Sequence, residues 1–176
     1  PASITAIGDY CFQGCTGLET IDLCGDGENV SLRLIGYNAF ENCSSLSSIT
    51  FPPNFRQEHP LLPNENKKLP ISYFNGCTSL QYIKVQNSDV DIVDALEADG
   101  TEDTDHGNYG KAGCTIEKFL KTVPDIFYFE GPEISAMHTT AKEHSAAFRY
   151  LNQDKYEKVM QCPELDQDGK PLHEAT

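Results

Sequence analysis

Apolar residues recur along the first half of the chain in one order, which the sequence repeats three times. The copies run from Ile7 to Leu23, from Ile35 to Phe51 and from Leu69 to Val85. Their shared pattern is (I/L)-x4-F-x-(G/N)-C-(S/T)-x-L-x2-I-x-(L/F/V). Each copy holds too few apolar positions to enclose a core alone. We therefore expect the copies to stack and to bury their faces against one another.

The end of each copy predicts a strand. Ile21 and Leu23 alternate with polar residues, which is typical of a strand that is buried on one face. Because the copies run in the same direction, we expect their strands to form a parallel sheet with about 4.8 Å between neighbours. We call each copy with its strand a rung. Phe12, Phe40 and Phe74 place one ring inside each rung, and these rings are expected to stack.

Seven cysteines suggest a disulfide framework, but three of them occupy one repeat position. Equivalent positions on stacked rungs lie about one rung apart, whereas a disulfide needs Cβ atoms about 3.8 Å apart. We therefore expect Cys15, Cys43 and Cys77 to form a buried column of free thiols. The odd total leaves at least one thiol unpaired. A bond between Cys11 and Cys24 stays open as an alternative.

The repeated F-x-(G/N)-C-(S/T)-x-L-x2-I signature resembles the BspA-like leucine-rich repeats, which occur on secreted and surface proteins of mucosal anaerobes and some parasites. The resemblance covers residues 1–85, and residues 126–148 are similar to the C-terminal unit of that family. It implies an α/β repeat fold: a right-handed leucine-rich-repeat solenoid with a parallel β-sheet, short helical turns and an α+β C-terminal cap. The rungs depart from the usual repeat of about 23 residues, because Cys15, Cys43 and Cys77 are 28 and 34 residues apart.

We expect a single domain over residues 1–176. Its predicted parts are rungs at 1–23, 24–51 and 69–85, an acidic insertion at 86–113, a C-terminal rung and cap at 114–160, and a tail at 161–176. Between the rungs we expect a short strand at Val30, Leu32 and Leu34, a strand end at Pro52-Pro53 and a surface loop at 54–68. Later elements are a short helix at Val90–Leu96, a helix at Thr115–Val123, a strand at Ile126–Phe129, a helix at 133–144 with Ile134, Met137 and Ala141 on one face, and a strand at Ala146–Leu151 that pairs with Tyr156–Met160.

The chain is acidic, with a formal charge of −14 from 27 acidic and 13 basic residues. This charge opposes binding to nucleic acid or to an anionic membrane. No apolar run is long enough to span a bilayer, and no leader is recognisable. Because Pro1 to Ile7 match the second half of a rung, we expect a processed or shortened chain.

The sequence contains no motif of an enzyme, such as G-x-S-x-G, H-E-x-x-H, a glycine-rich phosphate loop or C-x-x-C, so we expect neither catalysis nor a cofactor. His59, His106, His138, His144 and His173 are predicted to be solvated. Cys114 beside His106 would be a thiol nucleophile, but nothing supplies an orienting third group.

Glu164, Asp166 and Asp168 are weak calcium candidates. Their spacing matches an EF-hand loop, but the twelfth position of that loop is Ala175 instead of glutamate. Asn29 and Asn42 each begin a glycosylation sequon.

The outward positions of the strands are the candidate binding surface. They are Thr20, Asp22, Ser48, Thr50, Tyr82 and Lys84. Stacked repeats use such faces for partners, and exposed tyrosine is favoured at interfaces. We therefore expect a monomeric, non-catalytic, adhesion-type module of a secreted or surface-anchored protein, which binds a host extracellular or cell-surface protein. The alternatives are a structural spacer without a ligand, and an adhesive module that calcium would stabilise against melting.

Overall fold

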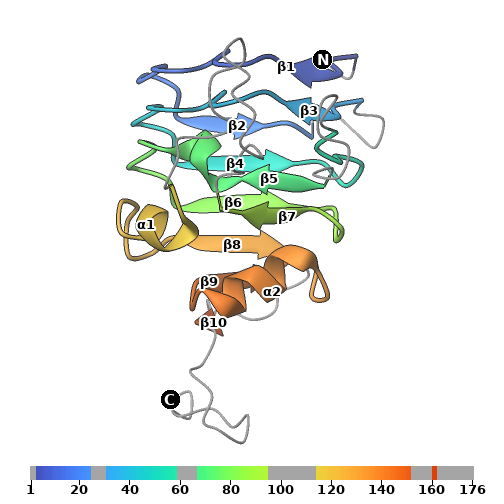
Figure 1. Cartoon of the computed structure of the whole chain (residues 1–176), viewed down its shortest axis with the longest axis vertical. Coiled ribbons are helices and arrows are strands. Elements are labelled where there is room, and N and C mark those ends of the chain that lie inside the picture. Colours follow the sequence, from blue (N-terminus) through green and yellow to red (C-terminus); the bar gives the residue numbers. More distant parts are fainter. Residues whose placement is uncertain (1–2, 25–30, 59–66, 95–113, 152–159, 162–176) are drawn as a thin grey trace, which may run out of the picture.

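The strands of the protein are stacked one on another along the long axis of the molecule (Figure 1). A computed structural model describes residues 3–24, 31–58, 67–94, 114–151 and 160–161. Its largest sheet has six strands: β2 (Thr20–Asp22), β4 (Ser48–Phe51), β6 (Tyr82–Val85), β8 (Tyr128–Gly131), β9 (Ala147–Tyr150) and β10 (Met160–Gln161). All neighbouring strands are parallel except β9 and β10, which pair in opposite directions. The predicted parallel sheet is confirmed.

Two short parallel sheets form a second wall. One pairs β1 (Ala6–Ile7) with β3 (Leu34–Ile35), and the other pairs β5 (Lys68–Pro70) with β7 (Asp91–Val93). The strand β3 is shorter than predicted and lies at the end of the predicted segment. A 3₁₀ turn, η2 (Ile71–Phe74), follows β5. Each complete rung therefore crosses both walls.

One glutamine side chain takes the place of a strand next to β3. The Oε1 of Gln57 accepts from the N–H of Ile35 at 3.0 Å, and its Nε2 donates to the carbonyl of Ile35 at 2.8 Å. Gln57 is fully buried, and Phe55 packs at a tilt on Phe51 with ring centroids 4.8 Å apart. The prediction of a surface loop at 54–68 is therefore wrong for these two side chains. An aperiodic segment gave no sign that single residues would complete the wall.

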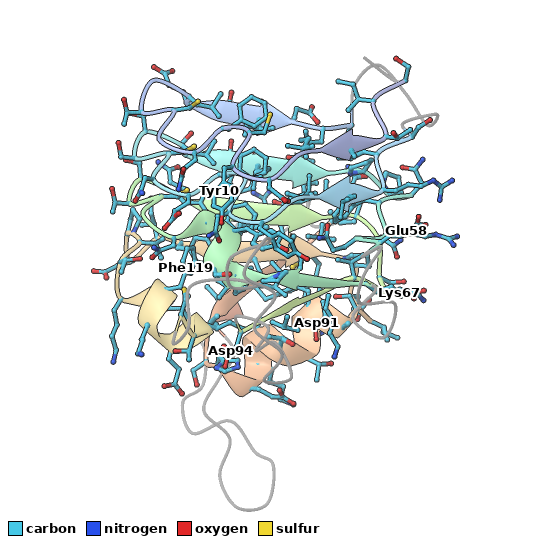
Figure 2. All side chains as sticks on the ribbon, turned by 45° about the horizontal axis from the view of Figure 1, so that its top comes forward. Tyr10, Glu58, Lys67, Asp91, Asp94 and Phe119 are labelled. Atoms are coloured by element: carbon cyan, nitrogen blue, oxygen red, sulfur yellow. The ribbon has the colours of Figure 1, made fainter. Side chains whose placement is uncertain are left out.

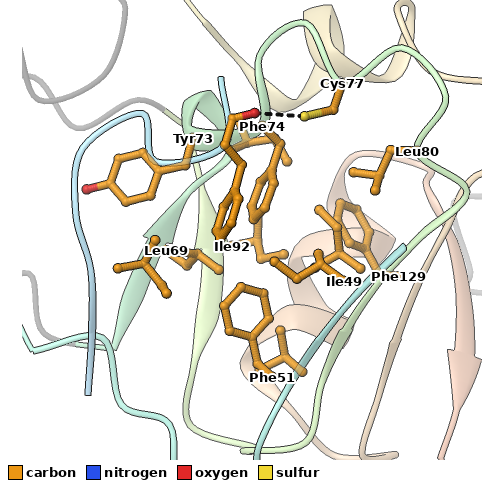
Figure 3. Close-up of a cluster of buried hydrophobic side chains, with 14 of the residues drawn as sticks. Ile49, Phe51, Leu69, Tyr73, Phe74, Cys77, Leu80, Ile92 and Phe129 are labelled. Carbon is orange, nitrogen blue, oxygen red and sulfur yellow. Dashed lines mark hydrogen bonds between the residues drawn. The ribbon is translucent and has the colours of Figure 1, made fainter. Parts of the chain in front are cut away.

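The core is built from columns of equivalent residues. Phe12, Phe40 and Phe74 stack with centroids 5.6 and 5.9 Å apart and planes within 5° of parallel, as predicted. The inward positions of the six-stranded sheet also lie in register. They are Ile21, Ile49, Ile83, Phe129 and Phe148. Figure 3 shows Phe51, Phe74 and Ile49 converging in the space between the walls.

A polar ladder follows the phenylalanine column. Gln13, Glu41 and Asn75 each come directly after the stacked ring of their rung. The carboxylate of Glu41 is 5 % exposed and accepts from Nε2 of Gln13 at 2.8 Å and from Nδ2 of Asn75 at 3.3 Å. Amide donors from both neighbouring rungs therefore satisfy this buried acid.

The cysteine column forms, but only two of its three members are buried. The thiol of Cys43 donates to the carbonyl of Phe12 at 3.0 Å, and Cys77 donates to that of Phe40 at 3.1 Å (Figure 3). Burial raises the pKa of Cys77 to about 12, so its thiol stays a donor at neutral pH. Cys15 is exposed, against the prediction, because no described residue covers that side of its rung. Cys11 and Cys24 are free thiols.

The predicted helix at Val90–Leu96 is wrong, because Asp91–Val93 form strand β7. Val90 and Ile92 are fully buried, and Ile92 pairs with Leu69 of β5. The free backbone edge of β5 selects an extended partner, and this tertiary effect overrides the helical spacing of a short apolar run. The described part of the predicted acidic insertion therefore ends at Asp94, and residues 95–113 lie outside the described chain.

Two carboxylates of the β7 segment hold the helices (Figure 2). Oδ1 of Asp94 accepts from the N–H of Ile116, the first residue of α1 (Ile116–Leu120), at 2.8 Å. Oδ1 of Asp91 accepts from Oγ1 of Thr140 at 2.7 Å, which joins β7 to α2 (Ala136–Glu143). Burial raises the pKa of Asp91. The helix predicted at Thr115–Val123 is confirmed in a shorter form, with Thr115 as its N-cap.

The C-terminal elements match the predictions except at their boundaries. Strand β8 begins at Tyr128, so Ile126 precedes it and is 64 % exposed. Ser135 caps α2, which leaves Ile134 outside the helix and 90 % exposed. Ile134 therefore does not share the buried face of Met137 and Ala141, as we had predicted. The strand predicted at 146–151 is confirmed by β9. Its predicted pairing with Tyr156–Met160 is confirmed at Met160 in β10, and residues 156–159 lie outside the described residues.

His138 is not a solvated histidine, although the sequence predicts one. Its Nδ1 lies 2.7 Å from the carbonyl oxygen of Glu133, and its Nε2 lies 3.2 Å from the hydroxyl of Tyr150. Its ring also packs on Phe148, with centroids 4.7 Å apart. His138 thus ties α2 to β9, and His144 is half-buried as well. The remaining histidines, His59, His106 and His173, lie outside the described residues.

We expect Phe40→Ala to lower the free energy of unfolding by about 3–5 kcal/mol, because loss of the central ring of the stack would leave a cavity in the core. Urea unfolding followed by circular dichroism measures this loss. Tyr10→Ala is the matched control, since that ring is 42 % exposed, and it should cost less than about 1 kcal/mol. Equal losses in the two variants would show that the stack does not hold the rungs together.

We expect N-ethylmaleimide to modify Cys11 and Cys15 in the native protein well before Cys43 and Cys77, because exposure and thiolate content set the rate. Peptide mapping by mass spectrometry after timed quenching gives the order of modification. Unfolding in urea should equalise the rates. Native labelling of Cys77 as fast as Cys15 would contradict the buried column.

Candidate functional site

Two rows of side chains cover the side of the large sheet that faces away from the core. We call this surface the outer face. The first row holds Thr20, Ser48, Tyr82 and Tyr128, and the second holds Asp22, Thr50, Lys84, Glu130 and Arg149. These positions alternate with the buried column of Ile49, Ile83 and Phe129. The structure therefore brings all six residues that the sequence singled out onto one surface.

Three residues of the outer face were missed by the sequence analysis: Tyr128, Glu130 and Arg149. We placed the strand at Ile126–Phe129, and this shift hid the pairing of Tyr128 with Tyr82 and of Glu130 with Lys84. A usable signal was present. Tyr128-Phe129-Glu130 alternates like Tyr82-Ile83-Lys84, with a tyrosine, a large apolar residue and a charge.

Tyr82 and Tyr128 form a stacked pair on neighbouring rungs. Their ring centroids are 5.4 Å apart and their planes differ by 19°. Both residues are half-buried. Because the two rings already hold each other in place, ordering them against a partner would cost little further side-chain entropy. The pair therefore presents two ordered, amphipathic side chains to a partner.

Lys84 is held in an ion pair. Its Nζ lies 2.9 Å from Oε1 of Glu130, and the two side chains are 29 % and 10 % exposed. Arg149 is in register with Glu130 on the other side. The acid thus has a base on each neighbouring strand, and this part of the outer face carries two bases around one acid.

A hydrogen-bonded cysteine lies two residues beyond Asp22 along the chain. The N–H of Cys24 donates to Oδ1 of Asp22 at 2.9 Å, and Nε2 of Gln86 donates to the sulfur at 3.0 Å. Burial, followed by the nearby carboxylate of Asp22, raises the pKa of Cys24 to about 11. The thiol therefore stays protonated at neutral pH and is a poor nucleophile.

Other candidate chemistry finds little support in the described chain. Among these residues no group of three or more histidine, cysteine, aspartate or glutamate side chains could hold a metal ion. Glu164, Asp166 and Asp168 lie outside them, as do His106 and Asn29. Asn42 is exposed in a left-handed turn with φ 61°, and its N–H donates to the carbonyl of Asn75 at 2.7 Å. None of the described helices has the length and apolar character needed to cross a membrane.

A family model for the BspA type leucine-rich repeat region, with six copies, matches residues 1–95. This match extends beyond the third rung and includes β7, the strand that the sequence analysis misassigned. A search of curated proteins and a search of solved structures each gave no match. The family implies a repeat solenoid, which agrees with the stacked parallel strands. Because the matched segment exceeds half of the chain, the protein belongs to the BspA-type leucine-rich repeat family.

Proposed function

We propose that this chain is a non-catalytic, adhesion-type module of a secreted or surface-anchored protein, and that it binds a protein partner through the outer face. The family is one of protein-interaction repeats. The observation that carries the proposal for the outer face is the stacked pair of Tyr82 and Tyr128. Tyrosine is enriched among the residues that dominate binding energy, because one ring contributes both apolar area and a hydroxyl.

Lys84 has a different role in this proposal from the one that its sequence position suggested. Its charge is committed to Glu130, and a partner would have to break that pair to use it. We therefore assign the main contacts to Tyr82 and Tyr128, and secondary polar contacts to Thr20, Asp22 and Thr50. Ser48 is only 8 % exposed and offers little surface.

The architecture that we propose is one domain over residues 1–176, wound as a right-handed coil and closed by an α+β cap. The antiparallel pairing of β9 with β10 supports the cap, because it ends the parallel order of the sheet. The packing of His138 in α2 against Phe148 in β9 adds to it.

The partner is proposed to be an extracellular or cell-surface protein of a host. The charge of −14 disfavours binding to anionic surfaces. A monomeric module with few rungs offers a small contact area, so its binding should be weak for a single copy. Display of several copies would strengthen it through effective concentration.

A structural spacer is the second candidate function. Thr20, Ser48 and Thr50 are small and polar, and they give the N-terminal half of the outer face no anchor for a partner. A spacer would hold another domain at a distance and bind nothing itself.

We expect the domain, displayed on multivalent beads, to bind at least one protein in an array of extracellular-matrix and cell-surface proteins. Tyr82→Ala should reduce that signal at least fivefold, since loss of an interface anchor costs more than about 1 kcal/mol. Tyr10→Ala, which removes an exposed tyrosine away from the outer face, should leave it unchanged. Absence of any signal at high valency would favour the spacer.

We expect Lys84→Met to lower the free energy of unfolding by about 1–2 kcal/mol, because a largely buried carboxylate would lose its partner. The double variant Lys84→Met with Glu130→Gln should recover part of this loss. Chemical denaturation of the two single variants and the double variant measures the coupling. Additive losses would show that the ion pair contributes no stability.

A further inference from the structure

The first row of the outer face changes abruptly in side-chain size between Ser48 and Tyr82. Thr20 and Ser48 are short, whereas Tyr82 and Tyr128 carry rings, and all four lie in register. One face of the Tyr82 ring packs on Tyr128. Its other face is turned toward the strand of Ser48, where no ring of the described residues continues the stack. We call this place the tyrosine step.

The rung spacing accommodates one flat group per rung. Inside the protein, Phe12, Phe40 and Phe74 stack at 5.6 and 5.9 Å on three consecutive rungs. On the outer face Tyr82 and Tyr128 stack at 5.4 Å. A flat group from a partner that lies above Ser48 would therefore continue the tyrosine stack at its natural spacing, with the small, 8 % exposed Ser48 as the floor.

An acidic charge lies next to the tyrosine step. Asp22 is exposed and sits two positions along β2 from Thr20, the partner of Ser48. Such diagonal neighbours are about 7–8 Å apart, which a long side chain can bridge. Oδ1 of Asp22 accepts from the N–H of Cys24. Within the described ranges Asp22 forms no salt bridge.

Lys84, Arg33 and Arg56 each interact with another acid. Lys84 pairs with Glu130. On the second wall Arg33 pairs with Glu58, and Arg56 acts electrostatically on Asp89. Residues 3–24 contain Asp9, Glu19 and Asp22 but neither lysine nor arginine. The N-terminal part of the outer face therefore carries the acid Asp22 and no base of its own.

A ligand for the tyrosine step must be flat and positively charged. A guanidinium group is planar, stacks on tyrosine faces and forms paired hydrogen bonds with carboxylates. An ammonium group carries the charge but offers no plane, and a phenyl ring offers a plane but no charge. The imidazolium of histidine is flat and charged only below about pH 6.5. At neutral pH arginine is therefore the amino acid that meets both conditions.

We propose that the tyrosine step binds an arginine side chain of the protein partner, with its guanidinium stacked on Tyr82 above Ser48 and paired with Asp22. This inference rests on the proposed function and names the chemistry of the partner at that surface. The acidic chain would also attract such a basic segment before contact.

The test is a titration of the whole ¹⁵N-labelled protein with the peptide acetyl-Gly-Gly-Arg-Gly-Gly-amide, followed by amide chemical shifts. The amides of Ser48, Thr50 and Tyr82 should shift. The matched lysine peptide should bind at least threefold more weakly, because it cannot stack. The citrulline peptide, which keeps the plane and loses the charge, should bind at least fivefold more weakly.

Variants of the protein separate the two contacts. Tyr82→Ala and Asp22→Asn should each weaken binding of the arginine peptide at least fivefold, whereas Tyr82→Phe should change it less than twofold. Glu117→Gln, which removes one exposed acidic charge on α1, is the control for net charge and should have no effect. Equal affinity for the arginine and lysine peptides, or shifts confined to other surfaces, would overturn the proposal.

Failure of the arginine site can be distinguished from failure of binding through the outer face. An array signal that depends on Tyr82, without any shift by the arginine peptide, would refute the arginine site and support binding through the outer face. Shifts by the arginine peptide without an array signal would support the site and refute the adhesion-type role.

Discussion

Parallel strands in register place equivalent residues of successive rungs about 4.8 Å apart, and this spacing governs which side chains each position can hold. Flat rings suit it, as the stack of Phe12, Phe40 and Phe74 shows. Thiols suit it too, because each buried cysteine reaches the backbone carbonyl of the rung before it. The core is thus a set of columns, and each column repeats one kind of side-chain contact from rung to rung.

The second wall shows how the fold tolerates rungs of unequal length. Gln57 supplies both a donor and an acceptor to Ile35, so a side-chain amide satisfies backbone groups that would otherwise need a strand. The large sheet keeps its register across this substitution. Extra residues between the cysteines are therefore accommodated without disturbing the outer face.

The sequence predicted the parallel sheet, the ring stack and the position of the outer face, because the repeat itself encodes them. It failed where a tertiary partner decides the conformation. Val90 to Val93 are extended because β5 offers a free edge. Phe55 and Gln57 are buried because they fill the second wall next to β3, where the described residues form no further strand. The repeat also could not reveal Tyr128 and Glu130, since β8 does not carry the cysteine and phenylalanine signature. Exposure of Cys15 depends on what covers the first rung, which the repeat pattern does not specify.

The ladder of Gln13, Glu41 and Asn75 limits how rungs can be exchanged within the family's architecture. Glu41 is stable because amide donors reach it from above and below. Two rungs with acids at this position could not be neighbours without bringing buried like charges together. The residue after each phenylalanine is therefore selected by the adjoining rungs and not by its own. Recombination that shuffles whole repeats would have to keep two acids at this position from becoming neighbours, a constraint that acts between repeats and that no single copy displays.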